Sequence, residues 1–386
     1  MKARARFILL LLWLAGAALV LGMAVEPQLA PVFQDKDHQF TGVAISKKGR
    51  MFVNYPRWES PHQLDLTEVS ADGRQKPYPN LGWNSWDRGD SGSNRWVCVQ
   101  AVWVDDQDNL WVVDPASPQM EGVQGDGAKL VEIELTNDQV RAVYNLTDVV
   151  GRHSYLNDVR VDTATRTAYL TESQNGGIVV VDLASGQARL VLKGTDFVRA
   201  DNQRAVMIDG TALNRNGKPF VGQSDGIALS PDRQWLYFKP LSDVKLCRVR
   251  TADLRNPNLG ESDLEKRTYD LGNKFSASDG LIFDKQGNLY LSDMENDAIM
   301  RVTPGPNAEL KVVVHDKEKL IWPDTFSWFP DGSLCVSCSQ IQNMAWCHNG
   351  KSTRTTPYTI YKLKVTEVAA RASLRSLGEN HPRNAN

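Results

Sequence analysis

A short motif recurs six times along this chain and constrains its fold more than any other feature. In each copy a polar residue precedes an apolar run, a turn and a second, aromatic-rich run. The polar residues, here called the lead residues, lie roughly 45 to 70 positions apart and are Thr41, Gln100, Asn157, Asp225, Asp279 and Asp324. Each copy indicates a β-hairpin, because alternating apolar runs flank turns such as DKQGN and FPDG. This spacing suits a propeller blade of four short strands, which takes about 40 to 50 residues.

The repeat predicts an all-β fold, a six-bladed β-propeller over residues 25–366. A single four-stranded blade cannot bury both of its faces, so blades must stack around an axis. The copies follow one another without a Gly/Ser/Pro linker, which favours one domain. We expect each innermost strand to begin within about two residues of its lead residue. The segment Tyr358-TIYKLKV would complete the last blade or pair with N-terminal strands to close the ring.

The two ends of the chain differ from the repeats. Residues 1–24 combine a basic start, an apolar run and small residues at its end, which predicts a secretory signal peptide; a retained anchor is the alternative. Residues 367–386 are expected to form a loosely held tail. No later apolar run reaches the ~18 residues of a membrane helix. We therefore expect a secreted or periplasmic protein that has no membrane partner after cleavage.

Charge and cysteine content limit the partners. The net charge is −2 and no basic run follows the signal, which argues against nucleic acid as a partner. The five cysteines of an exported chain predict one or two disulfides. Cys335 and Cys338 share one expected strand, where positions three apart point to opposite faces. A buried structural role is therefore expected for them rather than zinc binding.

The lead residues are predicted to form a polar ring at one mouth of the central channel. Glycine follows three of them and leaves the axis uncrowded (Gly42, Gly226 and Gly280). Carboxylates packed so closely would raise one another's pKa, and a hard cation would relieve the conflict. Calcium prefers such oxygen ligands, so the Asn and Asp oxygens of the ring suit calcium better than zinc or copper, which favour His or Cys. If the chain is an enzyme, Asp279 or Asp324 would be the catalytic carboxylate; the alternative is that all of these residues are spacers that bond backbone N–H groups.

Other candidate ligand-binding residues surround that mouth. Gln100 belongs to the ring. His153 precedes Asn157 by four residues and is a candidate general base, because histidine is the residue type suited to proton transfer near neutral pH. Residues 77–97 form a long loop with three indoles, Trp83, Trp86 and Trp96. These indoles would either supply an aromatic wall to the channel or anchor the loop. A second long segment, 194–222, separates the third and fourth copies.

Four segments resemble the yellow / major royal jelly protein family. They are Val99-QAVWVDDQDNLWVV, Tyr155-LNDVRVD, Asp225-GIALSPDRQWLYF and Trp322-PDTFSWFPDGSLCV, and they occur in the family's order. The resemblance covers most of residues 38–345. It implies a secreted six-bladed propeller whose channel mouth holds a small organic molecule, often aromatic or amine-bearing. It implies no universal catalytic set.

The chain is more distantly similar to gluconolactonase and senescence-marker-type lactonases. That resemblance implies calcium at Asn157 and Asp279, with Asp225 in place of an asparagine. Thr41 stands where those enzymes have a glutamate. Two hypotheses therefore remain: an exported protein that binds a small organic ligand, which the closer resemblance favours, and a calcium-dependent lactonase. Calcium affinity would discriminate them, whereas the ligand's identity and the oligomeric state are not predicted.

Overall fold

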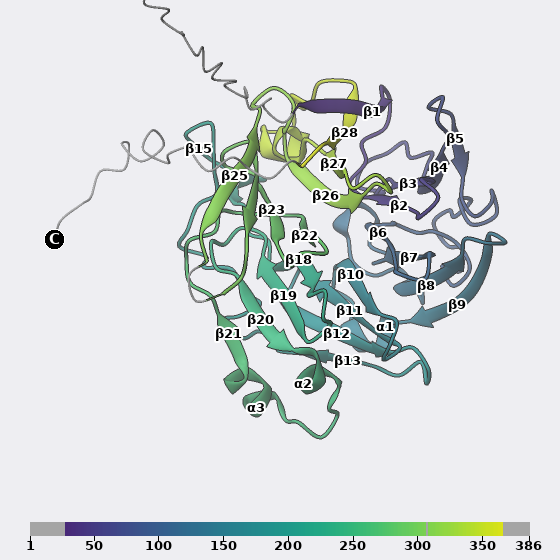
Figure 1. Cartoon of the computed structure of the whole chain (residues 1–386). Coiled ribbons are helices and arrows are strands. Elements are labelled where there is room, and N and C mark those ends of the chain that lie inside the picture. The colour runs from purple at the N-terminus through teal and green to yellow at the C-terminus, as the bar shows by residue number, and fades with distance from the viewer. Residues whose placement is uncertain (1–27, 306–307, 366–386) are drawn as a thin grey trace, which may run out of the picture.

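The computed structural model describes residues 28–305 and 308–365, and within them six four-stranded antiparallel sheets surround a common axis (Figure 1). The six-bladed propeller is confirmed. The signal peptide predicted for residues 1–24 and the tail predicted for 367–386 lie outside the described residues.

The blades follow the chain, and each is given from its innermost strand outward. Blade 1 consists of β2 (Val43–Ile45), β3 (Met51–Asn54), β4 (Leu66–Val69) and β5 (Gln75–Pro77). Blade 2 consists of β6 (Ala101–Val104), β7 (Asn109–Asp114), β8 (Lys129–Glu134) and β9 (Gln139–Asn145). Blade 3 consists of β10 (Leu156–Asp162), β11 (Thr167–Glu172), β12 (Gly177–Asp182) and β13 (Ala188–Val191).

Blade 4 consists of β18 (Ser224–Leu229), β19 (Trp235–Pro240), β20 (Cys247–Arg250) and β21 (Thr268–Asp270). Blade 5 consists of β22 (Leu281–Phe283), β23 (Leu289–Asp293), β24 (Ala298–Val302) and β25 (Leu310–His315). Blade 6 consists of β26 (Pro323–Trp328), β27 (Leu334–Cys338), β28 (Tyr358–Leu363) and β1 (Leu29–Asp35). Every innermost strand begins within two residues of its lead residue, as predicted.

The two ends of the described chain meet in blade 6. β28 pairs with β27 on one side and with the N-terminal β1 on the other, where Phe33 lies opposite Ile360. Figure 1 shows this closure as a purple strand beside a yellow one. Both alternatives proposed for Tyr358-TIYKLKV are therefore correct. The closure joins the first and the last described strands in one sheet, which holds the ring together.

The core lies between neighbouring blades, and the period of two in each strand builds it. On β7, Leu110 and Val112 pack toward blade 1, whereas Trp111 and Val113 pack toward blade 3. Both faces of this strand are buried, which explains its nearly continuous apolar sequence. The fold thus needs little from its loops and leaves them free to shape a site.

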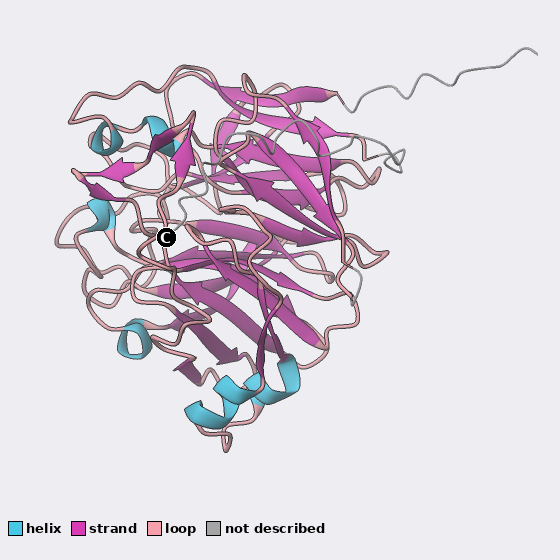
Figure 2. Ribbon diagram, turned by 90° about the vertical axis from the view of Figure 1, so that its left-hand side faces the viewer, coloured by secondary structure: helices cyan, strands magenta, loops and turns pink. Residues whose placement is uncertain are grey.

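The loops contain short strands and short helices. Segment 194–222 carries two small hairpins, β14 (Met207–Ile208) with β15 (Thr211–Ala212) and β16 (Asn214–Arg215) with β17 (Lys218–Pro219). The helices are α1 (Thr147–Val150), α2 (Thr251–Arg255) and α3 (Glu261–Lys266), with 3₁₀ turns η1 (Pro118–Met120), η2 (Ile341–Asn343) and η3 (Ala345–Cys347). In the side view of Figure 2, several helical turns and short strands lie on the left, beside the long strands of the blades. Within the described ranges no helix is both long and apolar enough to cross a membrane.

Candidate functional site at the channel ring

The lead residues form the predicted ring, and hydrogen bonds join one blade to the next. The Thr41 hydroxyl donates to the backbone oxygen of Gln100 at 3.0 Å. Gln100 Nε2 donates to Asn157 Oδ1 at 3.2 Å, and Asn157 Nδ2 donates to Asp225 Oδ2 at 2.7 Å. The first four blades are therefore linked through their lead residues at the start of the innermost strands.

The other half of the ring is acidic and buried. Asp225, Asp279 and Asp324 are 3%, 9% and 4% exposed. Burial, followed by the negative charge of Asp279, raises the pKa of Asp225 and of Asp324 well above the usual value. Burial also raises the pKa of Asp279 to about 7, although Trp322 Nε1 donates to its Oδ2 at 2.8 Å. The cluster therefore holds protons near neutral pH, and a bound cation would displace them.

Two carboxyl oxygens in this cluster are unpaired within the described part of the chain. Asp225 Oδ1 and Asp324 Oδ2 are buried and have no hydrogen-bond partner among residues 28–305 and 308–365. A buried acceptor left unpaired costs free energy, so such atoms call for an explanation. Two unpaired oxygens among crowded carboxyl groups are consistent with a site built for a positively charged group.

Sequence reasoning missed three charged residues near the ring. Asp158 follows Asn157 on β10, where the pairing with β11 shifts register between Leu156 and Val159. Burial raises the pKa of Asp225, Asp279 and Asp324 most, and the negative charge of Asp158 raises it further. A register shift of this kind re-aims side chains, and the alternating pattern alone does not reveal it.

Arg160 crosses the channel between blades that are not neighbours. From β10 in blade 3, its Nη2 donates to the Leu281 backbone oxygen in blade 5 at 2.7 Å. Its guanidinium also lies 4.0 Å from the ring centroid of Trp103 in blade 2. This buried arginine therefore links blades 2, 3 and 5. The charge in the otherwise apolar half of this strand was the signal that could have identified it.

Lys239 is the third missed residue. It is fully buried on β19, and its Nζ donates to the backbone oxygens of Pro240 and Asp243 at 3.2 and 2.7 Å. Burial lowers its pKa to about 7, against the opposing charge of Asp243. A lysine in the apolar run WLYFKP was again a visible signal.

An aromatic layer covers the ring on its mouth side. The Tyr155 hydroxyl donates to Gln100 Oε1 at 2.8 Å and accepts from Trp58 Nε1 at 2.6 Å. Trp322, bonded to Asp279, packs edge-on against Phe220 with ring centroids 5.6 Å apart. These aromatic side chains belong to one buried cluster contributed by loops of several blades. The acidic half of the ring thus lies beneath an aromatic layer.

The other proposed ligand-binding residues do not join this ring. His153 is exposed in the loop before β10. Trp83 and Trp96 pack together with centroids 4.4 Å apart, and Trp96 is fully buried in the core between blades 1 and 2. Trp86 is 4% exposed beneath the guanidinium of Arg57, at 5.3 Å. The placement of the three indoles supports the loop-anchoring alternative.

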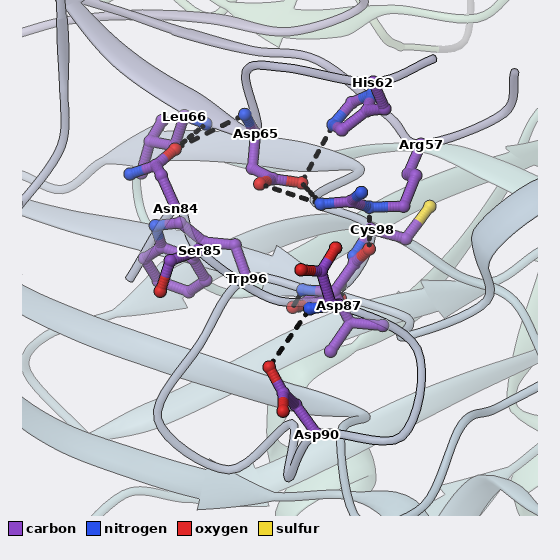
Figure 3. Close-up of polar contacts among 12 residues, drawn as sticks. Arg57, His62, Asp65, Leu66, Asn84, Ser85, Asp87, Asp90, Trp96 and Cys98 are labelled. Carbon is purple, nitrogen blue, oxygen red and sulfur yellow. Dashed lines mark hydrogen bonds and ion pairs between the residues drawn. The ribbon is translucent and has the colours of Figure 1, made fainter. Parts of the chain in front are cut away.

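A polar cluster ties the tryptophan loop to blade 1 (Figure 3). Asp65 binds Arg57 Nη2 at 3.3 Å and His62 Nε2 at 2.9 Å. Asn84, from the loop, accepts hydrogen bonds from the backbone N–H groups of Asp65 and Leu66 at 3.3 and 3.0 Å. These bonds hold the loop against blade 1.

The disulfide prediction was wrong. All five cysteines are free, and four of them are buried (Cys98, Cys247, Cys335 and Cys338). On β27, Cys335 packs into the core beside blade 1, whereas Cys338 packs into the core beside blade 5. Opposite faces separate the two sulfur atoms, as the strand geometry predicted.

The ring offers a partial fit to calcium. Its donors are all oxygen atoms, and two of them are unpaired. Across the described ranges, however, no group of three or more His, Cys, Asp or Glu is arranged to hold a metal ion. A calcium ion would therefore rely on the Asn157 amide together with Asp225 and Asp279. Asn157 would have to present Oδ1, whereas it now directs Nδ2 at Asp225.

Known proteins match both the sequence and the fold. Residues 97–370 match the family model described as "Major royal jelly protein". Major royal jelly protein 5 of Apis mellifera is 24% identical over 270 residues, covering 65% of this chain and 42% of that protein. Major royal jelly protein 7 of the same species is 23% identical over 268 residues, covering 65% and 57%. The chain thus spans about half the length of these curated relatives.

Solved structures share the fold at low identity. A gluconolactonase from Xanthomonas campestris superposes with a TM-score of 0.51 at 11% identity, covering 88% of this chain and 90% of that one. A luciferin-regenerating enzyme superposes with a TM-score of 0.52 at 10% identity, covering 88% and 95%. At such identities the likeness concerns the fold alone.

Proposed function

The chain belongs to the major royal jelly protein family, and from this premise we propose that it is an exported binding protein for a small organic cation. Export rests on the signal predicted at residues 1–24. The ligand would lie at the mouth of the channel, between the acidic half of the ring and the aromatic layer. The main support for this proposal is the pair of buried, unpaired carboxyl oxygens of Asp225 and Asp324.

The chemistry of the two layers supports an aromatic amine. An ammonium group would meet Asp225, Asp279 and Asp324, and charge-assisted hydrogen bonds are the stronger kind. Its ring would pack against indole and phenol faces, where aromatic pairs and cation–π contacts add to the affinity. Because the aromatic layer covers the ring, its loops would have to open for entry, and association would be slow.

Titration with tyramine tests this proposal. We expect saturable quenching of the intrinsic tryptophan fluorescence, because Trp58 and Trp322 lie in the aromatic layer. Asp324→Asn keeps the size and removes one charge, and it should weaken binding at least about tenfold, or ~1.4 kcal/mol. Asp331→Asn is the matched control, since Asp331 lies in the exposed turn of the same blade, paired with Lys362 at 2.7 Å. Equal affinities of the two variants, or no binding by the wild type, would exclude the ring as the site.

A calcium-dependent lactonase is the second candidate, and the oxygen-only donor set of the ring favours it. Asn157, Asp225 and Asp279 would hold the ion, which when bound would polarise a lactone carbonyl. Asp324, as a buried carboxyl group beside that set, could then accept a proton from water. The missing first-blade glutamate at Thr41 counts against this reading.

Calcium itself separates the two candidates. If the ring binds calcium, adding it at about 100 times its Kd should stabilise the protein by ~2.7 kcal/mol. Asp279→Asn should remove most of that gain, because it deletes one of the two charges. Melting temperatures measured with calcium and with a chelator check this. A variant that responds to calcium as the wild type does would show that Asp279 is no ligand.

A further inference from the structure

A separate pocket lies outside the aromatic layer. It has a volume of about 490 Å³ and is formed by the small hairpins of segment 194–222 and by the loop that contains η2 and η3. Trp346 in its wall contacts Trp58, with centroids 5.8 Å apart, and Trp58 bonds Tyr155 of the mouth. Aromatic side chains therefore stand between this pocket and the ring. Its volume is in the range that holds a small ligand.

The wall of the pocket is polar but nearly neutral. Its carboxylate, Asp209, is already paired with Lys317. The imidazole Nε2 of His348 is engaged with the Gln342 backbone oxygen at 2.9 Å. The remaining polar lining is mostly carboxamide, from Asn214, Gln342, Asn343 and Asn349, and apolar surface comes from Ile208, Leu213 and Trp346. This composition favours a neutral ligand that both donates and accepts hydrogen bonds.

Two polar atoms in this wall lack partners. Gln342 Oε1 and Trp346 Nε1 are buried without a hydrogen bond among the described residues. One is an acceptor and the other a donor. Leaving both unpaired costs free energy, and a small adjustment of the wall around a ligand hydroxyl would satisfy either. A ligand hydroxyl can donate to the first atom or accept from the second, whereas a single ion can pair with only one of them.

The wall is otherwise held firmly. The backbone N–H of Asn216 donates to the Trp346 backbone oxygen at 2.7 Å. The Arg215 guanidinium lies over the Trp346 indole at 4.4 Å. The Thr353 N–H donates to the Asn343 backbone oxygen at 2.9 Å. A pocket whose frame is fixed in this way loses little entropy when a ligand binds.

We propose that this pocket is a binding site for a neutral sugar. Carboxamides would bond the hydroxyls, and the apolar wall would contact the C–H groups of the ring. The site is distinct from the channel ring and does not depend on what the ring binds.

Saturation-transfer NMR and calorimetry with glucose, maltose and N-acetylglucosamine test the proposal. At least one of these sugars should bind with a millimolar or lower Kd. Gln342→Met removes the unpaired acceptor and should weaken that sugar at least about tenfold, with no loss of melting temperature. Ala212→Trp, at an exposed position that lines the pocket, should fill it and abolish binding.

The controls separate this site from the channel. Gln187→Met, an exposed change on blade 3, should leave sugar binding unchanged. Asp279→Asn should bind the sugar as the wild type does, even if it no longer binds tyramine. The proposal is overturned if none of the sugars binds, if either Gln342→Met or Ala212→Trp binds as the wild type does, or if glucuronate binds more tightly than the neutral sugar that binds best.

Discussion

Asp114→Ala is expected to lower the free energy of unfolding by about 3–5 kcal/mol, the cost of leaving a buried charge without its partner. Asp114 Oδ2 lies 2.7 Å from Lys129 Nζ, and both side chains are at most 1% exposed. Asp114 also accepts the backbone N–H groups of Val97, Cys98 and Ala116 at 2.7–3.0 Å. The substitution therefore leaves Lys129 without its charged partner. It also removes the hydrogen bonds to Val97 and Cys98, which lead into Gln100.

Equilibrium urea unfolding measures this loss, and a second substitution tests its cause. In the Asp114→Ala background, Lys129→Met should recover part of the stability, because it removes the uncompensated charge. Recovery should be incomplete, since three backbone donors stay unpaired. A loss below about 1 kcal/mol for Asp114→Ala would mean that the pair is not buried as described.

Gly280→Ala is expected to cause the second largest loss in the free energy of unfolding. A Cβ at this position would lie 2.2 Å from the Asp324 backbone oxygen and 3.0 Å from Phe326 Cδ2. The obstacle is backbone of the next innermost strand, which cannot rotate away. The cost should therefore exceed the ~1–3 kcal/mol typical of overpacking.

The same denaturation experiment should separate crowding from a general effect of alanine. At Gly305 a Cβ would meet no atom of residues 28–305 and 308–365 within 4 Å, so Gly305→Ala should change the stability by less than about 0.5 kcal/mol. Comparable effects of the two substitutions would argue against the close approach of blades 5 and 6 at the axis.

The sequence predicted most of the fold because the fold is repetitive. Alternating apolar runs and turns placed all six innermost strands within two residues, and glycine after Asp225 and Asp279 marked the crowded axis correctly. The lead residues fell on the ring for the same reason, since each occupies the same position of a repeated unit. The sequence pattern therefore predicts the features that every repeated unit shares.

The rest depends on contacts between distant segments. Arg160 and Lys239 break the pattern of their strands, and only the packed blades show that they lie near the ring. Trp58 and Tyr155 come from loops, whose conformations follow no period, so their part in covering the mouth was not predictable. Trp86 and Trp96 looked like a binding wall because sequence alone does not distinguish an exposed indole from a buried one. The expected disulfides are not found, because an oxidising compartment does not by itself bring two sulfur atoms together.

The most direct test of the channel site is the number of protons released when it binds a cation. Burial raises the pKa of Asp279 to about 7, so this group is largely protonated at about pH 6. Burial and the charge of Asp279 raise the pKa of Asp225 and Asp324 well above the usual value. A bound ammonium favours the ionised carboxylates and lowers their pKa, so protons must leave as the ligand enters. Calorimetric titration of tyramine in buffers of different ionisation enthalpy counts those protons. We predict the release of about one proton per ligand near pH 6, with less release from Asp279→Asn. Binding without proton release, or with the same release from that variant, would contradict a cation site at the ring.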